Sequence, residues 1–502
     1  MSGWWSLLPF LVVIPLAVWT KQVLPGLFAA LLVGSYIKDH SLLGGIKTML
    51  TYLVNNLVQS SNIRIIIFLY VFAGLVSIIK FAGGIKGFVH LVSKKVKSRK
   101  SAMLLTWFST MVTFSDPDFR IVTIAPIMKA LKKRLNLPAE ELGFTIEVTS
   151  NPVVGLIPLA TAFVGYMVSI IHMALKHEGI HQPAYEVYVK SIPFNFFSYS
   201  ILIVGLYYSF FKHSNKKEKN SATIEGPGKH PQNFAMEAAT EAVLPGKKSV
   251  LHSNPNEEQG EEDLQSCQNE YNEDTPIKPW NFILPLSLVL VLTLFLSWWD
   301  GHFKATSFLN AFIRADALGV MLESLFITLI VTLAFFLAQK FPIDKLLTHF
   351  VKGGNNLMSV ILMLGLIWAV SAVSEDLGFS KFITSHVAGW IPHYFVAPIL
   401  FLLGALISYF IGSSWGTWGL LMPLGITLAH HAGANILLVI GAVFASGTFG
   451  AFSSPLSDNS VTLCTILDLP IMKYSRSKLV PSLIAAGIST LMFGIMSFFM
   501  RA

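Results

Sequence analysis

The sequence is poor in charged residues and in cysteine, and each shortage excludes a class of protein. Only 13% of the 502 residues are Asp, Glu, Lys or Arg, whereas 53% are hydrophobic. Soluble domains average about 25% charged residues, so this composition indicates an integral membrane protein in a lipid bilayer. The two cysteines, Cys267 and Cys464, form neither a disulfide framework nor metal-ligand spacing.

Other functional signatures are also missing. The first apolar stretch, Trp4 to Trp19, has no cationic segment before it and another apolar stretch directly after it, which predicts a transmembrane helix and not a cleaved signal. The run Gly83 to Gly87 lacks the strand and helix that flank a nucleotide-binding loop. No catalytic constellation occurs at a recognisable spacing, so we expect neither an enzyme nor a cofactor. The net charge of +8 requires no nucleic acid partner, because Lys and Arg in short loops orient helices in the membrane.

The most informative pattern is a repeat at a constant shift. The apolar segment Phe114 to Met128 is interrupted by two acids, which Pro126 follows. The apolar segment Gly412 to Gly425 is interrupted by a Ser/Gly/Thr run, which Pro423 follows. Pro158 and Pro455 each interrupt a later apolar segment. Both pairs are 297 residues apart, since 423 − 126 and 455 − 158 give the same number. Interrupted hydrophobic segments at matching places in two halves are typical of the binding site of a secondary transporter.

Apolar stretches of spanning length fall into two groups with a long polar stretch between them. We expect a first transmembrane repeat over residues 1–211 and a second, inverted repeat over residues 280–502. Residues 212–279 carry cationic and acidic runs without apolar periodicity, which predicts a disordered cytoplasmic linker.

Two segments in each half do not fit a simple spanning helix. Residues 102–128 lie between two cationic loops that both belong on the cytoplasmic side, so this segment must enter and leave on one side as a re-entrant hairpin. Residues 142–174 exceed the roughly 20 residues of a span and are interrupted midway, which indicates a broken helix. Residues 396–425 and 435–467 repeat both features in the second half.

The number of crossings sets the relative orientation of the halves. Because the first half makes five crossings, an odd number, the second half is inverted. The cationic segment Lys473 to Lys478 then falls on the cytoplasmic side, in agreement with the positive-inside rule. The sequence therefore predicts an all-α polytopic membrane protein with two inverted repeats, each with a re-entrant hairpin and a broken helix.

Four carboxylates fall within these apolar segments: Asp116, Asp118, Glu147 and Asp458. An ionised acid at the membrane centre costs roughly 2.5–3.5 kcal/mol, so each must be paired, protonated or bound to a cation. Arg120 is the expected charge partner of Asp118. Alternatives to a role in cation binding stay open. The pair of Arg120 and Asp118 could only stabilise the hairpin, and Glu147 could face water at a helix end. Asp458 follows a helix break and is equally suited to cap the second half-helix.

Side chains with hydroxyl or amide oxygens gather at the same interruptions. They are Thr149, Ser150, Asn151, Ser413, Ser414, Thr417, Ser454, Ser457 and Asn459. A hard cation such as Na⁺ takes carboxylate, hydroxyl and unwound carbonyl oxygens, so these residues and the four acids form the predicted cation- and proton-binding site. Burial disfavours the charged form of a carboxylate, so an acid that binds either Na⁺ or H⁺, but not both, is sufficient for exchange.

At these residues the sequence resembles the NhaC-type sodium/proton antiporters of the ion-transporter superfamily. The matching stretches are FSDPDFRIVT, LGFTIEVTSNPVVGLIP, SSWGTWGLLMPL and FGAFSSPLSDNSVTLC. The resemblance implies a bacterial inner-membrane exchanger with inverted repeats. It also implies that the site contains Asp116, Glu147, Ser413, Thr417, Ser457 and Asp458.

The chain departs from the family pattern at three places near the expected site, and at one of them the usual Asp-Ser-Thr becomes Glu147-Val148-Thr149. The usual Asp-Asp-Tyr-Phe becomes Asp116-Pro117-Asp118-Phe119, which shifts one acid by a position. The usual Gly-Asp-His before Ser-Pro becomes Gly450-Ala451-Phe452, which removes an acid. The family that the chain resembles also holds carriers of organic acids such as malate and lactate.

The sequence therefore predicts a secondary active transporter that exchanges Na⁺ (or Li⁺) for H⁺ by competition at a mid-membrane carboxylate site. The alternative is a carrier of small organic acids that is coupled to Na⁺ or H⁺. Half-helix N-termini and Arg120 support the alternative, because both favour anionic groups. The expected partners are small ions or a small organic acid and the bilayer. A homodimer stays open, since no residue demands one.

Overall fold

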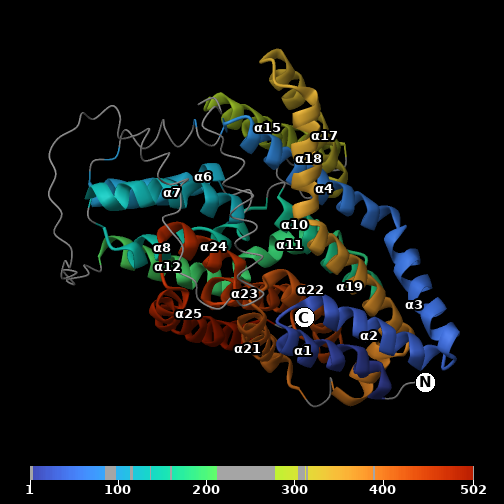
Figure 1. Ribbon diagram of the computed structural model, residues 1–502. Helices are drawn as coiled ribbons and strands as arrows, with labels where there is room; N and C mark the ends of the chain where they lie inside the picture. The colour runs from blue at the N-terminus through green and yellow to red at the C-terminus, as the bar shows by residue number, and fades with distance from the viewer. Residues whose placement is uncertain are drawn as a thin grey trace, which may run out of the picture.

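A computed structural model describes residues 4–84, 87, 96, 98–113, 117–135, 137–158, 161–211, 278–303, 311, 315–387 and 391–500. Every regular element of several residues in these ranges is a helix (Figure 1). Residues 212–277 of the predicted linker lie outside the described ranges, so its disorder and the exact limits of the two halves stay predictions.

The first half of the described chain is a series of helices of very different lengths. They are α1 (Leu8–Thr20), α2 (Val23–Lys38), α3 (Leu42–Leu57), α4 (Ser60–Phe81), α6 (Arg99–Thr113), α7 (Pro117–Leu135), α8 (Ala139–Val148), α9 (Asn151–Val154), α10 (Ala162–His177), α11 (Ala184–Ser191) and α12 (Phe196–Phe210).

The second half follows a similar order. Its helices are α15 (Trp280–His302), α17 (Ala317–Ala338), α18 (Ile343–Asn356), α19 (Met358–Asp376), α20 (Phe379–Phe382), α21 (His393–Ile411), α22 (Ser414–Ala432), α23 (Ile436–Ser453), α24 (Asp458–Leu467) and α25 (Ile471–Phe499). Short 3₁₀ or π turns precede α1 and α12 and follow α20.

The separation of 297 residues between the prolines of each pair also separates the boundaries of equivalent helices in the two halves. Helices α7 and α22 begin 297 residues apart (414 − 117) and end 297 residues apart (432 − 135). Helices α8 and α23 begin at the same separation (436 − 139). Helices thus start and stop at equivalent places in both halves, and Pro126 and Pro423 lie at equivalent positions inside α7 and α22.

The predicted fold class is confirmed: the chain is an all-α polytopic membrane protein with two inverted repeats. The hairpins are α6–α7 and α21–α22, and the broken helices run from α8 through α9 to α10 and from α23 to α24. The second hairpin turns at Gly412, whose φ of +77° a glycine adopts without strain. Ser413 then caps α22 by accepting a hydrogen bond from the backbone N–H of Gly416.

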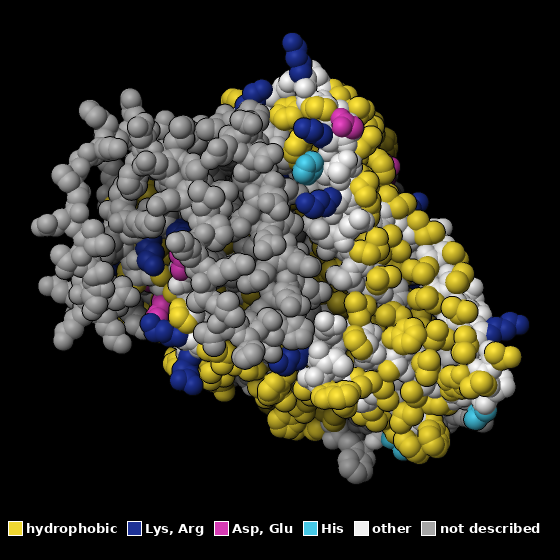
Figure 2. All heavy atoms as spheres, in the orientation of Figure 1, with side chains coloured by type: hydrophobic (Ala, Val, Ile, Leu, Met, Phe, Trp, Pro, Cys, Tyr) yellow, Lys and Arg dark blue, Asp and Glu magenta, His cyan; other side chains and the backbone are white. Residues whose placement is uncertain are grey.

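Seven helical segments of the described chain are long and apolar enough to cross a membrane, and the pair α11–α12, bent by 44°, raises the number to eight if it counts as one span. Helices α3 and α18 are not among these segments, and glycines and polar residues interrupt their apolar runs. Figure 2 shows hydrophobic side chains over the face formed by α2 and α3, where Phe28, Leu43 and Val54 are exposed. A bilayer covers such a face.

The helices of the two halves interleave around α22 and α23. Helices α4, α15, α17 and α18 stand together at one end of the molecule, and α6, α7, α8, α12 and α25 lie at the other (Figure 1). Helix α23 is enclosed along its length, and α8 packs against both α24 and α12. This arrangement brings the break that follows α8 close to the second half of the chain.

Candidate functional site

The two acids of the first hairpin tip are not placed by the structure. Asp116 lies outside the described residues, and the side chain of Asp118 does so as well. Their roles in cation binding, and the pairing of Asp118 with Arg120, therefore stay predictions.

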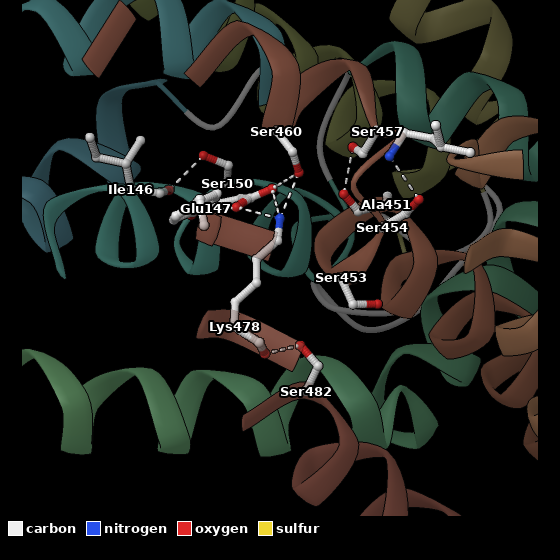
Figure 3. Close-up of polar contacts among 12 residues, drawn as sticks. Ile146, Glu147, Ser150, Ala451, Ser453, Ser454, Ser457, Ser460, Lys478 and Ser482 are labelled. Carbon is white, nitrogen blue, oxygen red and sulfur yellow. Dashed lines mark hydrogen bonds and ion pairs between the residues drawn. The ribbon is translucent and has the colours of Figure 1, made fainter. Parts of the chain in front are cut away.

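Glu147 is the predicted site residue with the most contacts. Its carboxylate, near the end of α8, is fully buried, so the alternative that it faces water is wrong. Lys478 Nζ of α25 lies 2.8 Å from both Oε1 and Oε2 (Figure 3). Ser460 donates a hydrogen bond of 2.6 Å to Oε1, and Tyr474 donates one of 2.6 Å to Oε2. Glu147 of the first half thus forms a buried polar cluster with three residues of the second half.

Lys478 belongs to the cationic segment Lys473 to Lys478, whose cytoplasmic position stays a prediction. Its side chain is 0% exposed, although a cationic loop favours water-facing side chains. The ammonium also donates to Ser460 Oγ at 2.6 Å and lies 4.9 Å from the centre of the Tyr474 ring. A signal exists in the sequence: Tyr474, Lys478, Ser482 and Ala485 recur at helical spacing and form one buried face of α25.

Arg120 is fully buried in the first turn of α7 and makes four hydrogen bonds. Its Nη1 donates to Ser109 Oγ (3.2 Å) and Thr113 Oγ1 (2.8 Å), both on α6. Its Nη2 donates to the carbonyl of Thr106 (2.7 Å) and to Thr149 Oγ1 (2.6 Å). The guanidinium therefore joins the first hairpin to the break that follows α8. Among the residues that the structure describes, its Nε has no hydrogen-bond partner.

The hydroxyl groups at the helix breaks donate mainly to nearby carbonyl oxygens. Ser150 Oγ donates to Ile146 (2.7 Å), Thr417 Oγ1 to Ser413 (3.0 Å), and Ser457 Oγ to Ala451 (2.7 Å). Ser454 Oγ donates to Tyr409 (2.7 Å), and Ser414 is buried near the start of α22. A hydroxyl that donates a hydrogen bond keeps the lone pairs of its oxygen, so these groups remain able to coordinate a cation.

Two buried amides flank the two breaks. Asn151 is 4% exposed and Asn459 is 8% exposed, and within the described ranges neither Nδ2 of Asn151 nor Oδ1 of Asn459 has a hydrogen-bond partner. Asp458 is exposed in the first turn of α24, next to the N-cap residue Ser457, whose side chain makes no capping hydrogen bond, so the capping alternative for Asp458 stays open. The dipole of α24 favours an anion in that turn.

The structure brings together only some of the predicted residues. Thr149 contacts Arg120, whereas the partners of Glu147 are Ser460 and Lys478, which are outside the predicted set. Ser413 and Thr417 bond within the turn of their own hairpin. Within the described ranges, no group of three or more His, Cys, Asp or Glu side chains is arranged to hold a metal ion.

A second buried acid was not singled out from the sequence. Glu178 follows α10 and is 2% exposed. It accepts hydrogen bonds from Ser380 (3.0 Å) and from Thr427, and its Oε2 lies 3.0 Å from His431 Nε2. Because Thr427 and His431 belong to α22, Glu178 fixes the end of α10 to the second hairpin. A lone acid after a helix carries no sequence signal of such partners.

Comparisons with known proteins agree with this architecture. Residues 153–498 match the Na⁺/H⁺ antiporter family. A protein of Haemophilus influenzae of uncharacterized function is 24% identical over 483 residues, which cover 92% of this chain and 85% of that protein. The malate-2H⁺/Na⁺-lactate antiporter of Bacillus subtilis is 32% identical over 109 residues, which cover 21% of this chain and 23% of the antiporter.

Two solved transporters have a similar fold. The first is MtrF of Neisseria gonorrhoeae, from a class of antimetabolite efflux pumps, with a TM-score of 0.58 and 13% identity over 90% of this chain and 85% of MtrF. The second is the YdaH transporter of Alcanivorax borkumensis, which has an unusual topology, with a TM-score of 0.52 and 14% identity over 91% of this chain and 89% of YdaH. At these identities the likeness shows the fold alone.

Proposed function

Because this chain belongs to the Na⁺/H⁺ antiporter family, we propose that it exchanges Na⁺ (or Li⁺) for H⁺ across a bacterial inner membrane. The chain is a multi-pass secondary transporter, and the exchanged ions are its substrates and not resident cofactors. Exchange occurs by competition between the two cations at carboxylates in the interrupted segments of the two repeats.

The burial of Glu147 is the observation that carries this proposal. A carboxylate inside protein needs a compensating cation, because an unpaired buried charge is strongly destabilising, and in this structure the Lys478 ammonium holds that cation position. Glu147 lies two residues before Thr149, where α8 stops and backbone and hydroxyl oxygens become available. A buried acid beside an unwound segment combines the proton site and the oxygen ligands that cation exchange requires.

The proposed cation ligands come from both breaks and both hairpins. They are Asp116, Asp118, Glu147, Thr149, Ser150, Asn151, Ser413, Ser414, Thr417, Ser454, Ser457, Asp458 and Asn459. Arg120 is the proposed fixed charge beside them. The hydroxyls of this set retain lone pairs in the structure, which supports a role as neutral oxygen ligands.

Everted membrane vesicles with a pH-sensitive dye test this proposal. After energisation, added Na⁺ or Li⁺ should dequench the dye with the unaltered protein and fail to do so with Glu147→Gln or Asp458→Asn. The matched control is Glu140→Gln, since Glu140 lies on the same helix in a partly exposed ion pair with Lys473. Amounts of folded protein are compared by size-exclusion chromatography in detergent. Normal exchange in both site variants, or no cation response at all, would refute the proposal.

A carrier of small organic acids is the second candidate. Two observations favour it: Arg120 is a fully buried guanidinium whose Nε has no partner in the described part of the chain, and the chain partly matches the malate-2H⁺/Na⁺-lactate antiporter. An unpartnered Arg donor suits a carboxylate. In the same vesicles, a response to malate or lactate without a response to Na⁺ or Li⁺ would favour this candidate, and it should be lost in Arg120→Gln.

A further inference from the structure

Three oxygen atoms converge on the ammonium of Lys478. Glu147 Oε1 and Oε2 lie 2.8 Å from Nζ, and Ser460 Oγ lies 2.6 Å from it. All three residues are fully buried. Figure 3 shows the Lys478 side chain reaching from α25 toward Glu147 on α8 and Ser460 on α24. Two carboxylate oxygens and a hydroxyl are ligands of the kind that a hard monovalent cation takes, so the ammonium occupies a cation position.

A second ion pair joins the same two helices in a different environment. Lys473 Nζ of α25 lies 2.8 Å from Glu140 Oε1 of α8, and these side chains are 70% and 39% exposed. Water screens that pair, and its loss leaves both charges solvated. Loss of the Lys478 ammonium, in contrast, leaves the Glu147 carboxylate buried without its compensating charge.

We propose that Lys478 is a tethered cation that occupies the Glu147 carboxylate in place of Na⁺ and thereby sets the Na⁺ affinity of the transporter. This inference rests on the proposed function, in which Glu147 faces the transported cation during the cycle. Lysine suits the role because its ammonium is a compact point charge on a flexible stem. Na⁺ can bind the Glu147 carboxylate only when the Lys478 side chain moves Nζ away from it. The ammonium therefore competes with Na⁺ and keeps the Na⁺ affinity of the site low enough for Na⁺ to be released.

Equilibrium binding of ²²Na⁺ to the purified full chain in detergent tests the inference directly. Lys478→Met removes the tethered charge while it keeps an unbranched side chain, and the apparent Kd for Na⁺ should fall by about tenfold or more. In vesicles the same variant should show a lower KM for Na⁺ and a lower maximal rate, because tighter binding slows release. Lys478→Arg keeps a charge at Glu147 and should leave the Kd within about threefold of the unaltered value.

Two controls separate this role from a structural one. Lys473→Met removes a lysine from the same helix and breaks the exposed pair, and the Kd should not change. Glu147→Gln combined with Lys478→Met removes both charges, so the gain in affinity should disappear. If the methionine variant does not fold, Lys478→Gln replaces it, since its amide can still donate to Glu147.

The outcomes distinguish this inference from the proposed function. A folded Lys478→Met protein with an unchanged Kd for Na⁺ overturns the inference, even if the unaltered protein exchanges Na⁺ for H⁺. Absence of exchange by the unaltered protein overturns the proposed function, while the binding measurement still decides whether Lys478 competes with Na⁺. A lower Kd without a lower KM also overturns the inference, because the affinity would then not be that of the transport site.

Discussion

The indole Nε1 of Trp418 donates a 3.0 Å hydrogen bond to the backbone carbonyl of Phe444. Trp418 lies on the second hairpin helix and Phe444 on the broken helix α23, and both are fully buried. The two rings also pack edge to face, with centroids 5.0 Å apart. The hairpin and the broken helix of the second repeat are therefore held in fixed register, which positions the hairpin tip relative to the break that follows α23.

Gly447 should be intolerant of a side chain because of this contact. A Cβ at Gly447 would overlap Nε1 of Trp418 and lie 2.6 Å from its Cδ1. Gly447→Ala should therefore lower stability by about 1–3 kcal/mol, the usual result of overpacking. Thermal unfolding in detergent measures the effect. Gly487→Ala on α25 is the control, because no atom lies within 4 Å of its added Cβ. Equal melting temperatures for the two variants would contradict the prediction.

The turn of the second hairpin should depend on Gly412 for two reasons. Its φ is +77°, and an added Cβ would lie 2.6 Å from the backbone of Leu456 in the second break. Gly433 has a similar φ of +68° with open space around it. Gly433→Ala should cost only the left-handed strain of about 1–2 kcal/mol. Gly412→Ala should lower stability more than Gly433→Ala does and should also reduce transport. The difference between the melting temperatures of the two variants measures the effect of the clash with Leu456, because both variants carry the left-handed strain.

Arg120 should not tolerate replacement by lysine. Its two terminal nitrogens reach hydroxyls on α6 and Thr149 after α8, and one ammonium cannot span both groups. Arg120→Lys should lower stability by about 2–4 kcal/mol, because buried acceptors lose their donors. Arg64→Lys is the matched control, since Arg64 forms an exposed pair with Asp316 whose loss should cost less than about 1 kcal/mol. Similar unfolding temperatures for the two variants would argue against a structural role of the guanidinium fork.

Glu178 should contribute to stability through its contacts with the second hairpin. Glu178→Gln weakens the hydrogen bonds from Ser380 and Thr427, and the expected loss is about 2 kcal/mol, since hydrogen bonds to charged groups are the stronger ones. Glu186→Gln, in an exposed pair with Lys190 four residues later, should cost no more than about 0.5 kcal/mol. Thermal melting distinguishes them, and a larger loss for Glu186→Gln would refute the expectation.

Much of the fold followed from local signals in the sequence. Pro126 and Pro423 mark equivalent turns of helices α7 and α22, whose bounds coincide at the same shift. The predicted breaks at 142–174 and 435–467 also correspond to real interruptions after α8 and α23. Helix starts and stops depend on residues within a turn or two, so a single sequence contains the information that sets them.

The partners of the buried charges could not be derived in the same way. Lys478 lies within a cationic run between exposed neighbours, and its pairing with Glu147 spans 331 residues. Glu178 meets His431 across the two repeats, although neither residue carries a motif. A charged side chain near a helix end has the same sequence signature whether it faces water or protein, because burial depends on which other helix packs against it.

The sequence by itself determined the class of protein, the repeat, the places where helices break and the residue types at those breaks. These features depend on composition and on local backbone preferences. Only the tertiary structure decided that the Glu147 carboxylate contacts Lys478, Ser460 and Tyr474, and that Thr149 accepts a hydrogen bond from Arg120. The physical reason is that compensation of a buried charge requires a partner within about 3 Å, and the packing of α8 against α24 and α25 brings that partner from the other half of the chain.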